Sequence, residues 1–306
     1  MLSVYVLLQA FSLVVSLVIT KLVKPLFCFF TQRRMFNMTG QVPPTMSGAC
    51  GCSLKGDMYI FGGYDFSGQT NEMYCVNLTD TKYMSRKIIH ESGIFLFPRI
   101  IYFGGYGEKT TDDVRSRKDC FLVEEESWIV DLIWGWNNEV HIFDPVHASW
   151  SEPRTHGQAP SARATHASAQ LGHRGYIIGG KVMETSTSDI HCLDLESWTW
   201  SKIIPVSSSP VGRSWHTLTA VSDSSLFLFG GLSKDCKPMS DGWLFDVETK
   251  EWKEVEHPFK HKLRLWHTAC IGTDSDVIVF GGSCEYFLEV HKVGIRDTDR
   301  HATVLD

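Results

Sequence analysis

The stretch that decides the fold runs from Val211 to Trp252 and reads VGRSWHTLTAVSDSSLFLFGGLSKDCKPMSDGWLFDVETKEW. Its hydrophobic alternation and its turn residues predict four short β-strands. The second strand is a continuous apolar run, which suits burial on both faces, and it ends in the pair Gly230-Gly231. Paired glycines permit a positive φ and let neighbouring backbone come close, although one isolated pair would be typical of any hairpin. The four expected strands are His216–Val221, Leu226–Gly230, Gly242–Asp246 and Glu251–Val255.

Glycine pairs of the same kind recur along the chain, each directly after an apolar run. Their first glycines are 42, 75, 51 and 51 residues apart. A period of about 50 residues with four strands per repeat is typical of a propeller blade, which must stack on its neighbours to bury its sheet. The sequence therefore predicts an all-β propeller. The pairs are Gly62-Gly63, Gly104-Gly105, Gly179-Gly180, Gly230-Gly231 and Gly281-Gly282.

Two more elements recur with the glycine pairs. An Arg-x-x-His opening precedes each of the last three pairs, and an acidic turn leads to a tryptophan in three repeats. Because each element keeps its blade position, we expect the tryptophans to pack within the blades. We expect the histidines to be structural hydrogen-bonding groups rather than metal ligands. The openings are Arg163–His166, Arg213–His216 and Arg264–His267, and the turns are Asp144–Trp150, Asp194–Trp200 and Asp246–Trp252.

Residues 31–293 are predicted to form one propeller with about five recognisable blades, of which the first and last are incomplete. The chain enters this region in mid-blade, at a strand expected over Arg34–Met38. Too few residues separate Asn77 from Ile100 for an outer strand, a linker and the next inner strand. A charged insertion, Glu108–Ser127, is expected on the face where blade loops gather, which is often the binding face. Residues 294–306 are predicted to form a polar, disordered tail.

Residues 1–30 are markedly more hydrophobic than the rest. Met1–Thr20 contains one strongly polar residue, Gln9, and has about the 20 residues needed to cross a bilayer. The basic residues Lys21 and Lys24 follow it, so a helical transmembrane anchor here would hold the propeller in the cytosol. Two alternatives stay open, namely an N-terminus that never meets a membrane and an error in the deduced chain.

Composition narrows the function further. The formal net charge of −6 argues against a nucleic-acid-binding surface, which is normally basic. The nine cysteines, several of them inside strand patterns, favour reduced buried thiols in a cytoplasmic or nuclear domain. Motifs for hydrolases, zinc proteases and phosphate-binding loops do not occur, so we interpret the chain as a non-enzymatic protein without a metal or cofactor.

Several motifs in combination resemble the kelch-domain-containing protein family, members one and two, the kelch-repeat substrate receptors of cullin-RING ubiquitin ligases. The similarity extends from about Arg34 to Gly282. The resemblance implies a six-bladed parent propeller whose top pocket captures the C-terminal diglycine of a client protein. It also implies a C-terminal helical segment that docks on elongin B/C and a cullin. Because no 3.6-residue apolar spacing follows Val293, the sequence does not predict that segment here. The motifs are TMSGACG, YIFGGYD, IYFGGYG, WGWNNEVHIFD, GRSWHTLT, MSDGW and RLWHTAC.

The resemblance also implies which residues line the pocket. The tryptophan faces would offer a narrow apolar slot for glycine, and the tyrosine and serine hydroxyls could hydrogen-bond the peptide. Where the family carries two carboxylate-binding arginines, this chain has Lys181 and Ser186. Lys181 keeps a point charge without the bidentate fork of arginine, and Ser186 keeps no charge. The matching residues are Tyr106, Trp136, Ser214, Trp215 and Trp266.

Two functional hypotheses of different class follow. In the first, the chain is the client-recognition subunit of a ubiquitin ligase and its partners are client C-termini, elongin and a cullin. In the second, it is a kelch interaction scaffold without a degradation role, which could be tethered to a membrane through residues 1–20.

Overall fold

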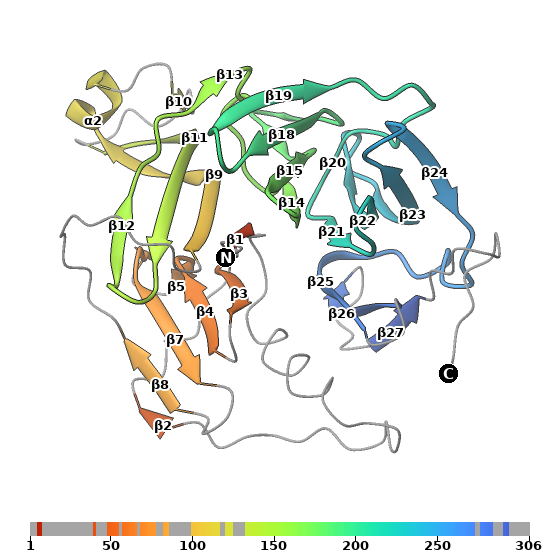
Figure 1. The fold of residues 1–306 in the computed structure, drawn as a ribbon, viewed down its shortest axis with the longest axis horizontal. Helices are drawn as coiled ribbons and strands as arrows, with labels where there is room; N and C mark the ends of the chain where they lie inside the picture. The colour runs from red at the N-terminus through yellow and green to blue at the C-terminus, as the bar shows by residue number, and fades with distance from the viewer. Residues whose placement is uncertain are drawn as a thin grey trace.

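The computed structural model describes residues 5–7, 39–40, 48–54, 57–65, 68–77, 82–85, 99–116, 120–124, 132–272, 276–283 and 290–293. Within these residues, five larger sheets stand side by side around a common centre, like the blades of a propeller (Figure 1). The helix among them is α2, Thr111–Ser116. The all-β propeller prediction is therefore confirmed.

Blade 1 is a five-stranded sheet in the order β2-β8-β7-β4-β3. Its outer strand β8 comes from the segment between Asn77 and Ile100, which the sequence had assigned to no strand. Arg34–Met38, the strand expected in mid-blade, lies outside the described residues, and the next two residues form β2. The strands are β2 (Thr39–Gly40), β3 (Cys50–Leu54), β4 (Asp57–Phe61), β7 (Met73–Asn77) and β8 (Lys82–Ser85), with a small hairpin of β5 (Tyr64–Asp65) and β6 (Gly68–Gln69).

Blade 2 is built on a long antiparallel pair. The strands β9 (Arg99–Thr110) and β11 (Leu132–Asp144) pair from Phe143 at one end to Leu132 at the other. The register shifts between Asn137 and Val140, and beyond this bulge the two strands continue as an extension that β10 joins. The remaining strands of this sheet are β1 (Tyr5–Leu7), β10 (Phe121–Val123) and β12 (Ser149–Ser151).

Blades 3, 4 and 5 follow the repeat closely, and the four strands expected between Val211 and Val255 are all present. Blade 3 contains β13 (His156–Gly157), β14 (Ala167–Leu171), β15 (Arg174–Ile178), β18 (Ile190–Asp194) and β19 (Thr199–Ile203), with a side hairpin of β16 (Lys181–Val182) and β17 (Thr185–Ser186). Blade 4 contains β20 (Arg213–Ser214), β21 (Thr217–Ala220), β22 (Ser225–Ser233), β23 (Pro238–Asp246) and β24 (Glu251–Val255). In the described part of the chain, blade 5 has three strands, β25 (Leu265–Ile271), β26 (Val277–Ser283) and β27 (Val290–Val293).

The hydrophobic N-terminal segment contributes one strand to the structure. Tyr5–Leu7 forms β1, which pairs in parallel with β9 on the edge opposite β11. In blades 1, 3, 4 and 5 that position belongs to an antiparallel strand. Among the described residues, no helix is both long enough and apolar enough to cross a membrane. Most of the predicted anchor lies outside the described residues, so the anchor stays a prediction.

Three of the glycine pairs join a blade to the next one. The N–H of the second glycine donates to the carbonyl of the arginine that opens the following blade. These bonds measure 2.8 Å for Gly105 to Arg163, 2.9 Å for Gly180 to Arg213 and 2.7 Å for Gly231 to Arg264. Because the accepting carbonyl lies against the pair, the junction requires residues without a Cβ.

The opening arginines are buried structural residues. Arg213 is 1% exposed, donates to the carbonyl of Gly230 at 3.0 Å, and forms two bonds of 2.8 Å to the carboxylate of Asp241. Arg163 repeats this pattern with Gly179 and Asp189. The bidentate pairing explains why a guanidinium can lie inside the sheet stack.

The acidic turns hold the outer strands of blades 2, 3 and 4. In all three turns an aspartate oxygen accepts hydrogen bonds from two backbone N–H groups that follow it, as in Asx-turns. The fifth residue of each turn, Ala148, Trp198 or Lys250, has a φ between 49° and 60°. The tryptophan two residues later then returns to the sheet, and Trp200 and Trp252 are only 3% and 5% exposed.

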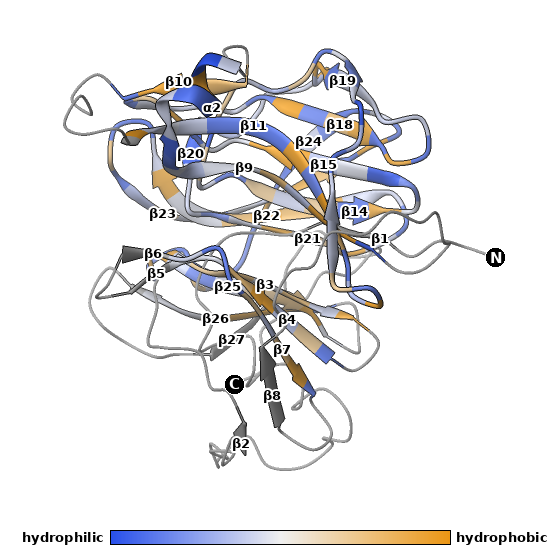
Figure 2. Cartoon of the chain, turned by 90° about the vertical axis from the view of Figure 1, so that its left-hand side faces the viewer, coloured by the Kyte–Doolittle hydropathy of each residue, from blue (hydrophilic) through white to orange (hydrophobic). Residues whose placement is uncertain are grey.

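The core consists of layers between neighbouring blades. One cluster joins strands of blades 3 and 4 around Tyr176, Phe245 and Trp252, and another joins blades 2 and 3 around Phe103 and Trp200. Figure 2 shows hydrophobic residues along the strands and hydrophilic residues at many of their connecting turns. The predicted packing role of the turn tryptophans is confirmed.

The opening histidines also belong to this interior. The Nε2 atom of His267 lies 3.0 Å from the hydroxyl of Thr217 on the preceding blade. Burial, assisted by the nearby opening arginines, lowers the pKa of His166 and of His267 to about 3, so both rings are neutral. The described residues contain no group of three or more His, Cys, Asp or Glu side chains that could hold a metal ion, and their cysteines are free thiols.

Candidate functional site

The extension of blade 2 carries the first two predicted pocket residues. Tyr106 on β9 and Trp136 on β11 are direct cross-strand partners, and their ring centroids lie 5.1 Å apart. Tyr106 is 39% exposed, whereas Trp136 is buried against Ala162 and Ala164 at the opening of blade 3. Tyr106 therefore presents an aromatic face to solvent, and Trp136 supports it.

Tyr106 also has a charged neighbour. Its hydroxyl donates to the carboxylate of Glu124, which directly follows β10. Partial burial and this carboxylate raise the pKa of Tyr106 to about 12, so the phenol remains a hydrogen-bond donor at neutral pH.

The side hairpin of blade 3 carries the two positions that differ from the family pattern. Lys181 on β16 and Ser186 on β17 are register partners, and the backbones of Lys181 and Ala164 exchange hydrogen bonds of 2.8 and 3.1 Å. The hydroxyl of Ser186 lies 3.3 Å from that of Ser214, which is 1% exposed. The hairpin thus connects the opening of blade 3 to that of blade 4.

The two tryptophans predicted to line the pocket from blades 4 and 5 share an unusual backbone conformation. Trp215 and Trp266 have φ values of 53° and 58°, and Thr165, at the same position of blade 3, has a φ of 56°. A positive φ is uncommon for residues other than glycine. The rings of Trp215 and Trp266 meet edge to face, 5.7 Å apart, and Trp266 is 47% exposed.

All six predicted residues belong to one continuous set of contacts. Trp136 packs on Ala164, whose backbone holds Lys181. Lys181 pairs with Ser186, Ser186 contacts Ser214, and the N–H of Trp215 donates to the carbonyl of Thr165 at 3.0 Å. The predicted residues therefore gather where the openings and hairpins of blades 2 to 5 meet, and we call this set of residues the pocket mouth. Its members are Tyr106, Trp136, Lys181, Ser214, Trp215 and Trp266.

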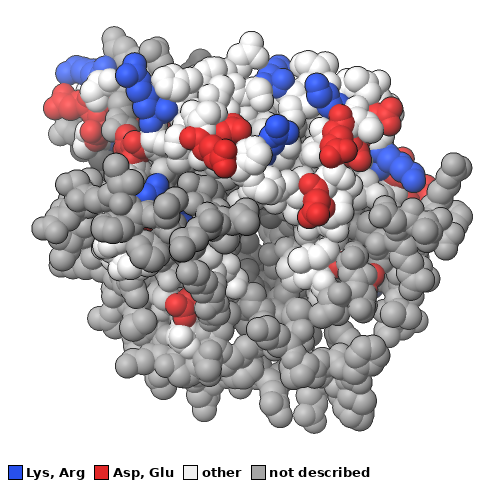
Figure 3. All heavy atoms as spheres, viewed as in Figure 1, with Lys and Arg blue, Asp and Glu red and all other residues white. Residues whose placement is uncertain are grey.

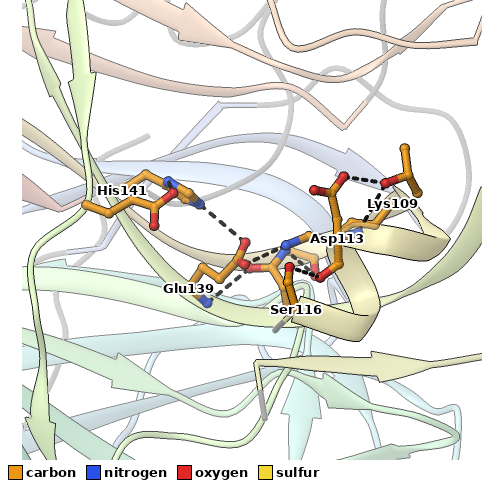
Figure 4. Close-up of polar contacts among 9 residues, drawn as sticks. Lys109, Asp113, Ser116, Glu139 and His141 are labelled. Carbon is orange, nitrogen blue, oxygen red and sulfur yellow. Dashed lines mark hydrogen bonds and ion pairs between the residues drawn. The ribbon is translucent and has the colours of Figure 1, made fainter. Parts of the chain in front are cut away.

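A buried ion pair holds the extension at its base. Glu139 lies beside the bulge of β11, and its carboxylate contacts Lys109 at 2.5 Å and His141 at 3.4 Å (Figure 4). The side chain of Glu139 is 8% exposed, so the pair is largely shielded from water. The ammonium of Lys109 also lies 5.5 Å from the centre of the Phe121 ring on β10. These contacts tie all three strands of the extension together.

The charge on one face of the described surface is mixed in sign. On the face shown in Figure 3, acidic and basic side chains of the described residues are interspersed rather than gathered into one basic surface. Lys181 supplies a positive charge at the pocket mouth, and Glu124 supplies a negative charge beside it.

Sequence reasoning missed three residues of this region. Glu124 and Trp134 lie on the extension, in or beside a segment read as a charged insertion, yet Trp134 and Trp136 already showed the two-residue alternation of a strand. Thr165 takes the place that tryptophan occupies in blades 4 and 5, and alignment of the three openings could have found it.

Comparisons with known proteins agree with this architecture. A family model described as the KLHDC2/KLHL20/DRC7 Kelch-repeats domain matches residues 26–231, and a model of the Kelch motif matches residues 216–257. The chain belongs to this kelch-repeat family. The resemblance seen in the sequence motifs is therefore confirmed.

Several proteins with a similar sequence are named kelch domain-containing proteins. Kelch domain-containing protein 1 of Homo sapiens is 46% identical over 265 residues, which cover 82% of this chain and 64% of that protein. The Mus musculus protein of the same name is 44% identical over 270 residues, covering 83% and 66%. Kelch domain-containing protein 2 of Homo sapiens is 40% identical over 272 residues, covering 85% and 66%. This kelch chain thus spans slightly less than two thirds of the length of these relatives.

A solved structure supports the fold. The structure of YjhT superimposes with a TM-score of 0.58 and covers 85% of this chain and 84% of its own. At 16% sequence identity this similarity concerns the propeller architecture and not the ligand.

Proposed function

We propose that this kelch propeller is the client-recognition module of a cullin-RING ubiquitin ligase and binds the C-terminal tails of client proteins at the pocket mouth. Glycine-ended tails suit the site because a residue without a side chain can lie close against aromatic rings. The observation that carries the proposal is the edge-to-face pair of Trp215 and Trp266 beside the hydroxyls of Ser186 and Ser214.

Recognition of the terminal carboxylate would depend on Lys181. Its ammonium can donate to a carboxylate as a point charge, and the two serine hydroxyls can add neutral hydrogen bonds. A charge-assisted hydrogen bond contributes about 1.5–3 kcal/mol, so one cation in place of two would lower the affinity without removing the preference for a free terminus.

Peptide binding tests this function. A fluorescent peptide that ends in diglycine should bind by fluorescence polarisation, and amidation of its C-terminus should weaken binding at least about tenfold. Trp266→Ala should weaken it as well, because the ring is half exposed and its loss leaves the core intact. Val206→Ala is the matched control, since Val206 is 69% exposed on the linker after blade 3. Equal binding of free and amidated peptides would contradict terminus recognition.

The ligase half of the proposal needs its own test. Elongin B/C and a cullin would have to associate with the same chain that binds the clients. Co-precipitation of elongin with the chain in cells supports a receptor, and its absence together with normal peptide binding supports the second hypothesis, a kelch scaffold without a degradation role. The exchange of a family arginine for Ser186 favours keeping this second hypothesis.

A further inference from the structure

The extension of blade 2 presents an ordered grid of side chains on one face. Successive residues of a strand point to opposite faces, so Tyr106 and Glu108 share a face of β9. Their partners on β11 are Trp136 and Trp134. The third strand completes the grid, because Leu122 pairs with Trp136 and the N–H of Glu124 donates to the carbonyl of Trp134 at 2.8 Å.

The second row of this grid combines an aromatic ring with two carboxylates. Glu108, Trp134 and Glu124 lie side by side across the three strands. Directly opposite residues in a sheet have Cβ atoms about 4.5–5.5 Å apart, so both carboxylates lie within reach of the tryptophan face. The first row provides Tyr106, whose ring packs 5.7 Å from Trp134 and whose hydroxyl holds the Glu124 carboxylate.

Among the described strand residues of the extension, the cation Lys109 lies on the other face. Lys109 follows Glu108 and therefore belongs to the opposite face, where it contacts Glu139 and the ring of Phe121. From Glu108 to Ser127 the sequence holds seven acidic and four basic residues, so the segment is acidic overall. An aromatic face bordered by carboxylates attracts a cation both through its π-electrons and through its charge.

We propose that this grid binds a lysine or arginine side chain of the client tail, a short distance upstream of the terminus held at the pocket mouth. Tyr106 belongs to both surfaces, so a tail that leaves the exposed ring of Tyr106 reaches Trp134 and Glu124 next. The inference rests on the proposed function for the placement of the tail, while the chemistry of the grid stands on the extension alone.

Peptides that differ only in charge test the proposal. An arginine is placed in turn at each position from the third to the tenth before a diglycine end, and each peptide is compared with its citrulline counterpart, which is neutral and of nearly equal shape. At one or a few neighbouring positions, the arginine peptide should bind about fivefold more tightly than its citrulline counterpart. We call this difference in affinity the arginine gain. The gain should shrink as salt is raised, because exposed charges are screened.

Variants locate the effect. Glu124→Gln keeps an acceptor for Tyr106 and removes the charge, and Trp134→Leu removes the aromatic face; each should abolish the arginine gain while citrulline peptides bind as before. The matched control is Glu248→Gln, which removes an exposed carboxylate from a turn of blade 4 and should leave the gain unchanged. A thermal melt of each variant checks that it is folded.

The outcomes separate the two proposals. If diglycine peptides bind but arginine gains nothing over citrulline at any position, the grid proposal is wrong and the receptor proposal stands. If amidated arginine peptides bind in a Glu124-dependent manner while free termini gain nothing, the grid is confirmed and terminus recognition fails. If no peptide binds, both proposals are overturned.

Discussion

The backbone N–H of Gly231 donates a hydrogen bond to the carbonyl of Arg264, 2.7 Å away, and so joins β22 of blade 4 to the opening of blade 5. The same carbonyl lies 2.8 Å from the point where a Cβ on Gly230 would stand. The junction between two blades therefore depends on both glycines of the pair, one for its donor and one for its missing side chain.

Alanine at Gly230 should destabilise the propeller more than alanine at Gly172. The two glycines have nearly equal φ values, 60° and 56°, but a Cβ at Gly172 meets nothing within 4 Å. Gly172→Ala should lower the free energy of unfolding by about 1 kcal/mol through backbone strain. Gly230→Ala should lower it by about 3 kcal/mol, because the new Cβ also clashes with the carbonyl of Arg264 in the next blade. Urea unfolding measures both, and equal losses would show that the inter-blade contact is not the cause.

Removal of the Arg213 guanidinium should be costly because Asp241 would lose its partner inside the sheet. Arg213→Met should lower the free energy of unfolding by about 3–5 kcal/mol. The double variant Arg213→Met/Asp241→Asn should be less destabilised than the sum of its single variants, since no unpaired charge remains. Arg115→Met, on the exposed surface of α2, is the control and should change stability by less than about 0.5 kcal/mol. If the losses in unfolding free energy of the two single variants simply add in the double variant, Arg213 and Asp241 do not stabilise each other.

Stability should fall in mild acid because of the buried histidines. The folded pKa of His166 and of His267 is about 3, against an ordinary value of 6.5, so between these values the unfolded chain binds protons that the folded chain does not. The free energy of unfolding should therefore decrease below pH 6.5, approaching about 1.4 kcal/mol per pH unit for each such histidine, and neither should contribute above it. Urea midpoints at pH 7.5, 6.5 and 5.5 measure this, and a flat profile would contradict neutral buried rings.

An arginine in place of Lys181 should improve recognition of a free terminus. The planar guanidinium can form two parallel bonds to a carboxylate where the ammonium acts as a point charge. Lys181→Arg should therefore bind a diglycine-ended peptide about three- to tenfold more tightly, with no gain for the amidated peptide. Lys253→Arg on the exposed side of β24 serves as the control. A gain that appears equally with both peptides would place the new contact away from the carboxylate.

The repeated elements of the fold could be predicted from the sequence because each is local. Each recurring motif spans only a few residues, so its structural role follows from those residues alone. The motifs are the glycine pair, the Arg-x-x-His opening and the turn that begins with aspartate. The pocket residues were carried over from a resemblance at these same motifs, and the structure brings them together. What each pocket residue binds stays a proposal.

Features formed by residues far apart in the chain could not be predicted in this way. Asp189 pairs with Arg163 across 26 positions, and nothing in the spacing of either residue indicates the other. The parallel pairing of β1 with β9 joins the N-terminal segment to a strand more than ninety residues later. The extension was missed for another reason, since its acidic composition hid a strand alternation that Trp134 and Trp136 display.

The third residue of each opening has a left-handed backbone conformation whatever its side chain. Glycine stands at the equivalent place in blade 1, as Gly48 with a φ of 73°, threonine in blade 3 and tryptophan in blades 4 and 5. The main-chain path is thus the same for three very different side chains. Single substitutions at this position can therefore change what one blade offers to a ligand, while the backbone of that blade keeps its conformation.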